Sequence, residues 1–418
     1  MPKVVFFSAL FISVSGQAAT LPQLMRQALN NHPQVHAQLA LINVKKVGVA
    51  TAKWQYYPTL SANYETVSAA KSDASFSGSS DVTTLSIEQP IWSGGLLAAG
   101  VDVASNQVAL EHGQLQVVKL NIAESVLQAY GKWVSGYETM QAWGRGLAVH
   151  KDLENQVQNR VDHGVSAPID LALATGRVAS THGQYLAAEA EAQLALDEIN
   201  QLTQNQLTHA DLVQDLSASA PLIINLNNHE LWVKAQLIDP QIALAQSQIQ
   251  LAQAELKQQK ASISPRLYFR AEQQVNSFSN AQAGSSTRFF FGLSGSSGAG
   301  LSLLSKNNAA AAMVTAKQAA LAAIKYTKRQ NLVNLITKID ALQFRVEALN
   351  AAMEATLAVS KSYSRQFLAG RKTWQEVLNS AREQVQMEVQ IVDLEAAVLV
   401  AHWRLLLNTS DLTHRGDS

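Results

Sequence analysis

Cysteine is absent from this 418-residue chain. Without thiols the chain has no disulfide framework, no thiolate zinc site, no cysteine nucleophile and no cysteine to carry a lipid anchor. Charge of either sign is also scarce, because charged residues make up 15% of the sequence and the 32 basic and 32 acidic side chains cancel. That balance gives no reason to expect nucleic acid or an acidic substrate as a partner.

Long apolar runs are missing too. Beyond the first residues, no segment holds about 18 uninterrupted apolar residues, so the sequence predicts no transmembrane helix. The start of the chain has the pattern of an export signal, in which Lys3 precedes a short apolar run from Val4 to Val14. Small residues at Gly16 and Ala18 predict cleavage after Ala18 or after the alanine that follows it. We therefore assign residues 1–19 to a signal peptide; a buried N-terminal strand or helix is the alternative.

Proline is absent from two long stretches, residues 93–163 and 301–369. In the first of them, apolar or small residues recur at every seventh position, a repeat typical of coiled-coil packing. One helix over 93–163 would be about 105 Å long at 1.5 Å per residue, so it must lie along other long helices. Shorter helices are predicted over 167–206 and 373–408, and the latter again carries apolar residues at steps of seven.

Four short stretches alternate with a period of two, which is typical of β-strands. They cover residues 59–67, 82–91, 266–275 and 288–295. Strands of this length can cross a bilayer at a tilt, but four strands are too few to close a membrane barrel. The chains must therefore associate if these strands span a membrane. A small soluble sheet that caps a helical protein is the alternative.

The same succession of elements occurs twice along the chain. Pro33 and Pro58 are each followed, 207 positions later, by Pro240 and Pro265 in similar surroundings. The glycines of the two predicted helix turns are separated by 206 positions. This near-constant spacing predicts a tandem duplication. We therefore expect a first repeat over 20–207, a linker over 208–228, a second repeat over 229–408 and a C-terminal tail over 409–418.

Several of these landmarks together resemble one family. They are the two proline-containing passages from helix to strand, the strand exit Gln89-Pro90-Ile91-Trp92-Ser93-Gly94-Gly95, and the two helix turns. In these features, over nearly its whole length after the signal peptide, the chain resembles the TolC-type outer-membrane efflux family, or outer membrane factors. The second turn, residues 367–379, is most similar to the type I secretion branch of that family.

The resemblance implies a mainly α-helical homotrimer with a small membrane β-barrel. Long coiled-coil-like helices would form an α-barrel in the periplasm, and three chains of four strands each would form a 12-stranded β-barrel in the outer membrane lipid of a Gram-negative bacterium. The implied function is an exit duct for type I protein secretion, with a large adhesin or an RTX-type protein as cargo. The implied partners are a periplasmic adaptor and an inner-membrane transporter of the ABC type.

Two other functions stay open at this point. One is the same duct in a multidrug or small-molecule efflux pump. The other, from a different class, is a soluble periplasmic coiled-coil scaffold or adaptor. An enzyme is not expected, because no nucleophile elbow surrounds any serine and the glycine runs lack the lysine of a phosphate loop. The histidines are scattered; His150 and His163 are too far apart to share a metal, and His32 and His36 have no third ligand nearby, so we expect no catalytic, cofactor or metal site.

By resemblance, function lies at the two helix turns, where the family meets its adaptor and closes its periplasmic mouth. The adaptor-facing turn residues are Gly164, Val165, Ser166, Gly370, Arg371 and Thr373. Asp170 after the first turn and Lys372 after the second can form an ion pair between neighbouring hairpins that latches the mouth. Glu376 and Asn379 take positions from which the family often projects carboxylates, although Asn379 is uncharged, and Phe367 replaces a tyrosine hydroxyl. The alternative is that these acids merely favour a helix start.

Overall fold

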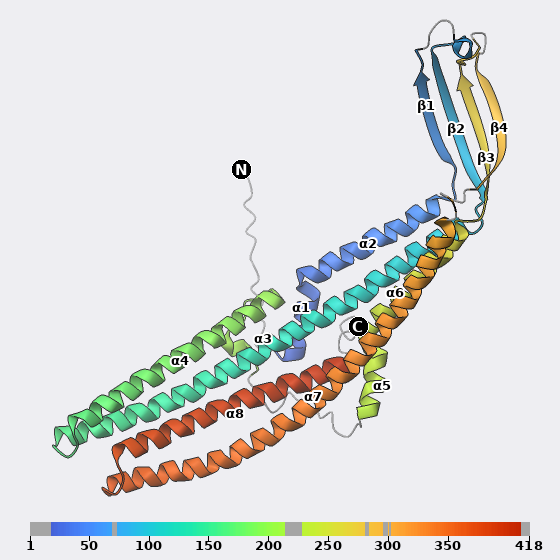
Figure 1. The fold of residues 1–418 in the computed structure, drawn as a ribbon. Helices are drawn as coiled ribbons and strands as arrows, with labels where there is room; N and C mark the ends of the chain where they lie inside the picture. The colour runs from blue at the N-terminus through green and yellow to red at the C-terminus, as the bar shows by residue number, and fades with distance from the viewer. Residues whose placement is uncertain are drawn as a thin grey trace, which may run out of the picture. The chain divides into compact units, whose positions relative to one another are not determined.

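The structure, a computed structural model, describes residues 18–68, 73–213, 228–280, 284–295, 300 and 302–410. These residues form mainly helices and one four-stranded sheet, as the sequence predicted (Figure 1). The predicted signal peptide up to residue 17, most of the predicted linker and nearly all of the C-terminal tail lie outside the described residues. No described helix combines the length and the apolarity needed to cross a membrane.

The elements follow one another in the same order in both halves of the chain: two helices, two strands, a long helix and a final helix. The first half contains α1 (Leu21–Asn31), α2 (Pro33–Trp54), β1 (Thr59–Thr66), β2 (Asp81–Trp92), α3 (Leu96–Asp162) and α4 (Pro168–Thr203). The second half contains α5 (Asn228–Ile238), α6 (Pro240–Ala261), β3 (Arg266–Val275), β4 (Ser286–Ser294), α7 (Ser302–Leu368) and α8 (Trp374–Thr409). Pro33 and Pro240 each occupy the first position of a helix, where the missing N–H costs nothing.

The chain folds into two compact units, and each unit draws on both halves of the sequence. Unit 1 comprises residues 1–33, 119–238 and 330–418, and unit 2 comprises residues 34–118 and 239–329. The repeats of the sequence are therefore not the compact units of the fold, because each unit combines elements of both halves; in the sheet, β2 of the first half pairs with β3 of the second.

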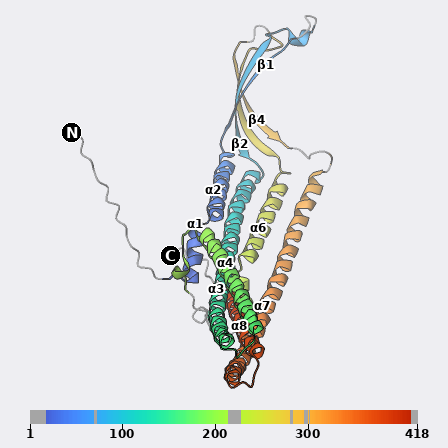
Figure 2. The same cartoon turned by 90° about the vertical axis from the view of Figure 1, so that its left-hand side faces the viewer.

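In unit 2, the strands form one antiparallel sheet in the order β1-β2-β3-β4, which lies beyond the ends of α2, α3, α6 and α7 (Figure 2). The register aligns Leu60, Ile87, Ala271 and Phe289 across all four strands. Because side chains alternate along a strand, this row defines one face of the sheet. That face carries Leu60, Tyr64, Leu85, Ile87, Phe269, Phe289, Phe291 and Leu293.

The opposite face of the sheet is mostly polar, although Tyr268 and Phe290 also lie on it. It carries Ser61, Asn63, Thr84, Ser86, Glu88, Arg270, Glu272, Gln274 and Arg288. Glu272 lies 3.3 Å from Arg288 and 3.9 Å from Arg270, measured between charged atoms. The alternation of side chains predicted from the sequence therefore gives the sheet one apolar face and one face that carries the charged residues.

In unit 1, α3, α4, α7 and α8 run side by side (Figure 1). The row of apolar residues at steps of seven in α8 forms much of the core: Leu378, Val385, Val392 and Leu399 are buried, and Leu406 is half-buried. Steps of seven keep these side chains on one face of the helix, which is why a local pattern could predict this core.

Candidate functional site: the two helical turns

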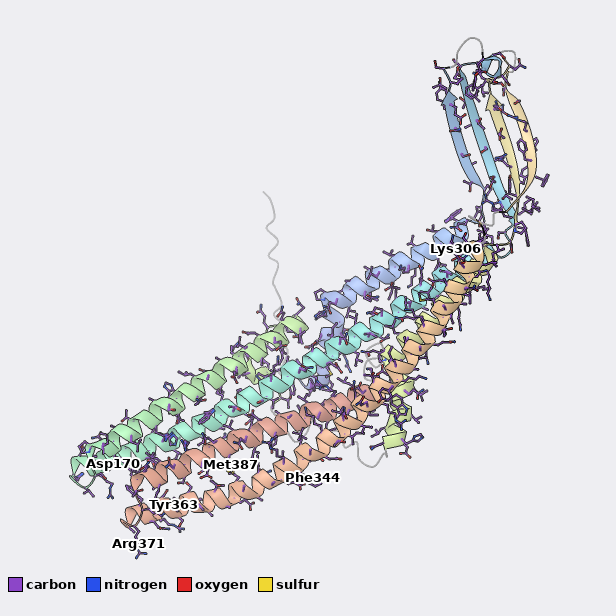
Figure 3. All side chains as sticks on the ribbon, in the orientation of Figure 1. Asp170, Lys306, Phe344, Tyr363, Arg371 and Met387 are labelled. Carbon is purple, nitrogen blue, oxygen red and sulfur yellow. The ribbon has the colours of Figure 1, made fainter. Side chains whose placement is uncertain are left out.

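The turns that join α3 to α4 and α7 to α8 both belong to unit 1. Figure 3 shows Asp170 and Arg371, one from each turn, at the same end of the four helices. Both turns therefore present their polar residues at one end of this unit.

The two turns are built by the same backbone hydrogen bonds. Gly164 and Gly370 each have φ of 72°, in the left-handed region that side chains with a Cβ disfavour. The bonds are Gly164 N–H to Val161 O (2.9 Å), Val165 N–H to Arg160 O (2.7 Å), Gly370 N–H to Phe367 O (2.9 Å) and Arg371 N–H to Gln366 O (2.8 Å). This pair of bonds at each turn is the Schellman motif, which satisfies the last carbonyls of a helix.

The helices that follow the turns begin differently. At the start of α8, the Glu376 carboxylate accepts the Thr373 N–H and hydroxyl, both at 2.9 Å, and the Thr373 hydroxyl accepts the Glu376 N–H at 3.4 Å. These reciprocal bonds form a capping box. At the start of α4 the equivalent cap is Ala167, which has no hydroxyl, so Asp170 has no such box to join.

Lys372 and Glu376 form an ion pair within one chain. The Lys372 Nζ lies 2.6 Å from Glu376 Oε1 and 4.4 Å from the centre of the Tyr363 ring. The hydrogen bond from Lys372, followed by those from the Thr373 backbone and hydroxyl, lowers the pKa of Glu376 from 4.5 to about 2. The same bond to Glu376 raises the pKa of Lys372. Both groups are therefore charged at neutral pH, and the charge of Lys372 is already balanced in its own chain.

The other predicted site residues are not brought together within the chain. Asp170 is half-buried in the first turn of α4, and its carboxylate forms no hydrogen bond or ion pair with any residue that the structure describes. Arg371 and Asn379 are exposed, and Val165 exposes 61% of its surface. Ser166 accepts a hydrogen bond from Arg160 Nε at 3.3 Å. The predicted pair of Asp170 with Lys372, which was expected between neighbouring hairpins, stays a prediction.

A cluster of apolar side chains beneath the turns was missed by the sequence reasoning. Phe367 was considered only as a residue that lacks a hydroxyl, but its side chain is buried. Its ring centre lies 5.1 Å from that of Trp374 and 4.8 Å from the Arg160 guanidinium carbon. Leu153, Val157, Ala174, Val377, Leu378 and Ala381 complete the cluster. Two aromatic residues that flank the glycine turn, Phe367 and Trp374, were the available signal. The cluster holds the two hairpins of one chain together.

A groove opens beside this cluster. It has a volume of about 450 Å³ and is lined by Val149, Asp152 and Gln156 of α3 and by Ser364 of α7, among others. Its lining mixes apolar and polar side chains, as protein–protein interfaces do.

His150, which lies in the α3–α4 hairpin, has a packing role. Its side chain is buried, and its Nδ1 lies 2.8 Å from the Thr181 hydroxyl on α4. Burial, followed by the positive charge of Arg177, lowers the pKa of His150 from 6.5 to about 4, so the ring is neutral at pH 7. Among the described residues, no three histidine, aspartate or glutamate side chains are grouped so that they can hold a metal ion.

Known proteins resemble this chain both in sequence and in fold. Residues 24–204 match the profile of the family described as outer membrane efflux protein. The outer membrane efflux protein BepC of Brucella suis biovar 1 is 20% identical over 418 residues, which cover 96% of this chain and 88% of BepC.

Two solved structures have the same fold. The outer membrane protein VceC of Vibrio cholerae superposes with a TM-score of 0.76 and 16% identity, over 93% of this chain and 95% of VceC. The CmeC outer membrane channel of Campylobacter jejuni superposes with a TM-score of 0.75 and 11% identity, over 99% of this chain and 96% of CmeC.

Proposed function

We propose that this chain is a member of the outer membrane efflux protein family, whose profile matches residues 24–204, and that three copies of it assemble into an exit duct. In this proposal the protein is an outer-membrane efflux channel that extends into the periplasm. The trimer, the gate at the turns and the cargo belong to the same proposal.

The main observation in support of a trimer is that the sheet has one apolar face and one mostly polar face. Phe291 and Leu60 expose 77% of their surfaces, and they lie on the apolar face. The outer strands β1 and β4 each pair on one side only in the described chain. An open edge cannot face lipid, because its backbone groups would lack hydrogen-bond partners. If β4 of each copy pairs with β1 of the next, three copies close a 12-stranded barrel with its apolar face outward.

The helical turns would then form the periplasmic mouth of the duct. We assign the exposed residues Val165 and Arg371 and the adjoining groove to contact with a periplasmic adaptor. Asp170, which lacks a partner among the described residues of its own chain, is the acid available to a neighbouring chain. In the closed mouth it pairs with Lys372 of that neighbour, in competition with Glu376.

For the cargo, we propose secreted protein, delivered by an inner-membrane ABC transporter and the adaptor. The sequence of the second turn, with Phe367 and Trp374 on either side of Gly370, supports this assignment through its likeness to the type I secretion branch. Small-molecule efflux is the second candidate. The description of BepC as an efflux protein favours it, at 20% identity over nearly the full chain.

The trimer and the channel can be tested on the purified protein. In mild detergent, light scattering should give the mass of three chains, and addition to a planar lipid bilayer should produce discrete conductance steps. A monomer in detergent that forms no conductance would overturn the proposal and favour a soluble scaffold.

A deletion strain can separate the two cargo classes. For secretion, the deletion should remove one or more large proteins from the culture medium and leave susceptibility to drugs and detergents unchanged. For efflux, susceptibility should rise while the proteins of the medium stay the same. The full-length gene should restore the wild-type result in either case, and the Gly370→Val variant described below provides a matched inactive control.

A further inference from the structure

The first residues that the structure describes form a small clasp with the segment that follows α4. Ala19 and Leu212 form a parallel β-bridge. The Ala19 N–H donates to the Asp211 carbonyl at 2.6 Å, and the Val213 N–H donates to the Ala19 carbonyl at 3.2 Å. Leu212 is 3% exposed. Both backbone groups of Ala19 are therefore used, across almost 200 positions of sequence.

The clasp is fastened to the middle of α3 by aromatic side chains. The Tyr130 hydroxyl donates to the Val213 carbonyl at 2.6 Å, and the Trp133 indole N–H donates to His209 Nδ1 at 2.9 Å. Tyr130 and Trp133 are almost fully buried, and Tyr137 stacks beside Trp133. The segment that pairs with Ala19 is thus held firmly, so the position offered to Ala19 is well defined.

The residues after Ala19 are equally engaged. Thr20 is the N-cap of α1 and forms a capping box with Gln23, whose side-chain oxygen accepts the Thr20 N–H at 2.8 Å. Leu21 and Leu24 are buried, with 2% and 0% of their surfaces exposed. From Ala19 onward, every residue up to the first turn of α1 contributes to the fold of unit 1.

We propose that a signal peptidase hydrolyses the bond between Ala18 and Ala19, so that Ala19 is the first residue of the mature chain and forms part of the clasp. The leader is then residues 1–18, one residue shorter than the 1–19 predicted from the sequence. Water supplies the atoms: the leader leaves with a new carboxylate on Ala18, and the nitrogen of Ala19 becomes an ammonium group. Cleavage at this bond places Gly16 and Ala18 at the two positions that the peptidase reads as small residues. Cleavage one bond later would place the larger Gln17 at the first of them.

The geometry also explains why the clasp requires Ala19 as the first residue of the mature chain. The new ammonium group of Ala19 lies where the N–H now donates to the Asp211 carbonyl, and a charged donor strengthens such a bond. If Ala19 were removed with the leader, the Asp211 carbonyl and the Val213 N–H would each lose their partner in the clasp. Cleavage before Ala19 therefore retains both backbone bonds, and cleavage after it loses both.

Intact-mass measurement and N-terminal sequencing of the protein from the outer membrane test the cleavage site. We expect a chain that starts at Ala19 and has the mass of residues 19–418. A chain that starts at Thr20, or at any other residue, overturns the proposal. This result does not depend on the cargo, or on whether the protein forms the proposed channel.

The role of Ala19 in the clasp is tested by deleting it, so that cleavage after Ala18 leaves Thr20 as the first residue. We expect the deletion to lower the melting temperature of the purified protein by at least about 2 °C. The matched control is Ala19→Ser, which keeps both backbone bonds and should melt like the wild type. Failure of the deletion variant to accumulate while Ala19→Ser accumulates supports the same role. Equal melting of the deletion variant and the wild type would exclude it.

Discussion

At the scale of single residues, the lysine of the α7–α8 turn already has an acidic partner within its own chain. Lys372 contacts Glu376 at 2.6 Å, whereas Asp170 contacts no charged group that the structure describes. A latch between chains must therefore draw Lys372 partly away from a carboxylate that it already touches. The free energy of such an exposed exchange is small, which suits a gate that has to open.

The latch gives the first prediction. Lys372→Ala and Asp170→Ala should each loosen the closed mouth, because each removes one partner of the proposed pair between chains. Single-channel conductance of the purified trimer should then exceed that of the wild type. Glu376→Gln, which keeps the cation, should not raise it, and Lys361→Ala is a matched control at an exposed lysine of the same hairpin. Wild-type conductance in both of the first two variants would mean that these residues are ordinary helix-start charges.

His150 gives the second prediction, on pH dependence. Its pKa is about 4 in the folded chain, against 6.5 for the free side chain, so between these values the unfolded chain binds more protons. Stability should therefore fall as pH falls from 6.5 towards 4, by at most about 1.4 kcal/mol per pH unit for each chain. The His150→Gln variant should lack this component. Thermal melting of both proteins at pH 7, 6 and 5 measures it, and parallel curves would rule it out.

At the scale of elements, the two helix turns show how one backbone design can carry different side chains. The Schellman bonds are the same at Gly164 and Gly370, but only the second turn is followed by a capping box. Asp170, at the start of α4, is therefore available to a partner, whereas Glu376, at the start of α8, is already bonded within its own turn. We expect the two hairpins to differ in function although they share their geometry.

The third prediction concerns the α7–α8 turn itself. Gly370→Val should strain the turn by about 1–2 kcal/mol, because a left-handed conformation is unfavourable for L-residues and worse for β-branched ones. An added Cβ at this position meets no atom within 4 Å, so the effect is one of the backbone alone. We expect export to be abolished while the trimer still reaches the outer membrane.

Gly176→Val supplies the control for that experiment. Gly176 lies within α4, where the backbone is helical, and an added Cβ there also meets no atom within 4 Å. Export by this variant should match that of the wild type. Normal export by the Gly370→Val protein would contradict a functional role for the turn.

At the scale of the whole molecule, the proposed barrel depends on the two faces of the sheet. One face is richer in large apolar side chains than the other, and in a membrane barrel the lipid-facing surface is the apolar one. The fourth prediction follows: Phe291→Arg, with the charge on the apolar face near the barrel midplane, should cost roughly 2–4 kcal/mol and reduce assembly of the trimer in the outer membrane. Ser86→Arg, on the polar face, should assemble normally. Heat-modifiable migration of membrane fractions on gels distinguishes them, and equal assembly of both variants would reject this orientation.

The sequence alone was sufficient for the four strands, for the two long helices and for the helix that follows each of them. The signals that mark helices and strands act within a few residues. They are proline at the first position of α2 and α6, glycine at the two turns, and the apolar periods of two and seven. The predicted strands and long helices were accordingly found close to where the patterns placed them. Local backbone preferences and the repeat of apolar residues are properties of neighbouring positions, so they can be read along the chain.

Only the tertiary structure decided which distant residues meet. The bridge between Ala19 and Leu212, the burial of Phe367 beneath Arg160 and the composition of the two units depend on contacts across the chain. The partner of Lys372 is a different case, because Glu376 lies only four positions away and competes with the distant Asp170, which is also an acid at the start of a helix. Glu376 is the partner within the chain because one helical turn brings it to 2.6 Å. Sequence patterns identify the candidates for such contacts, but distance in the folded chain selects among them.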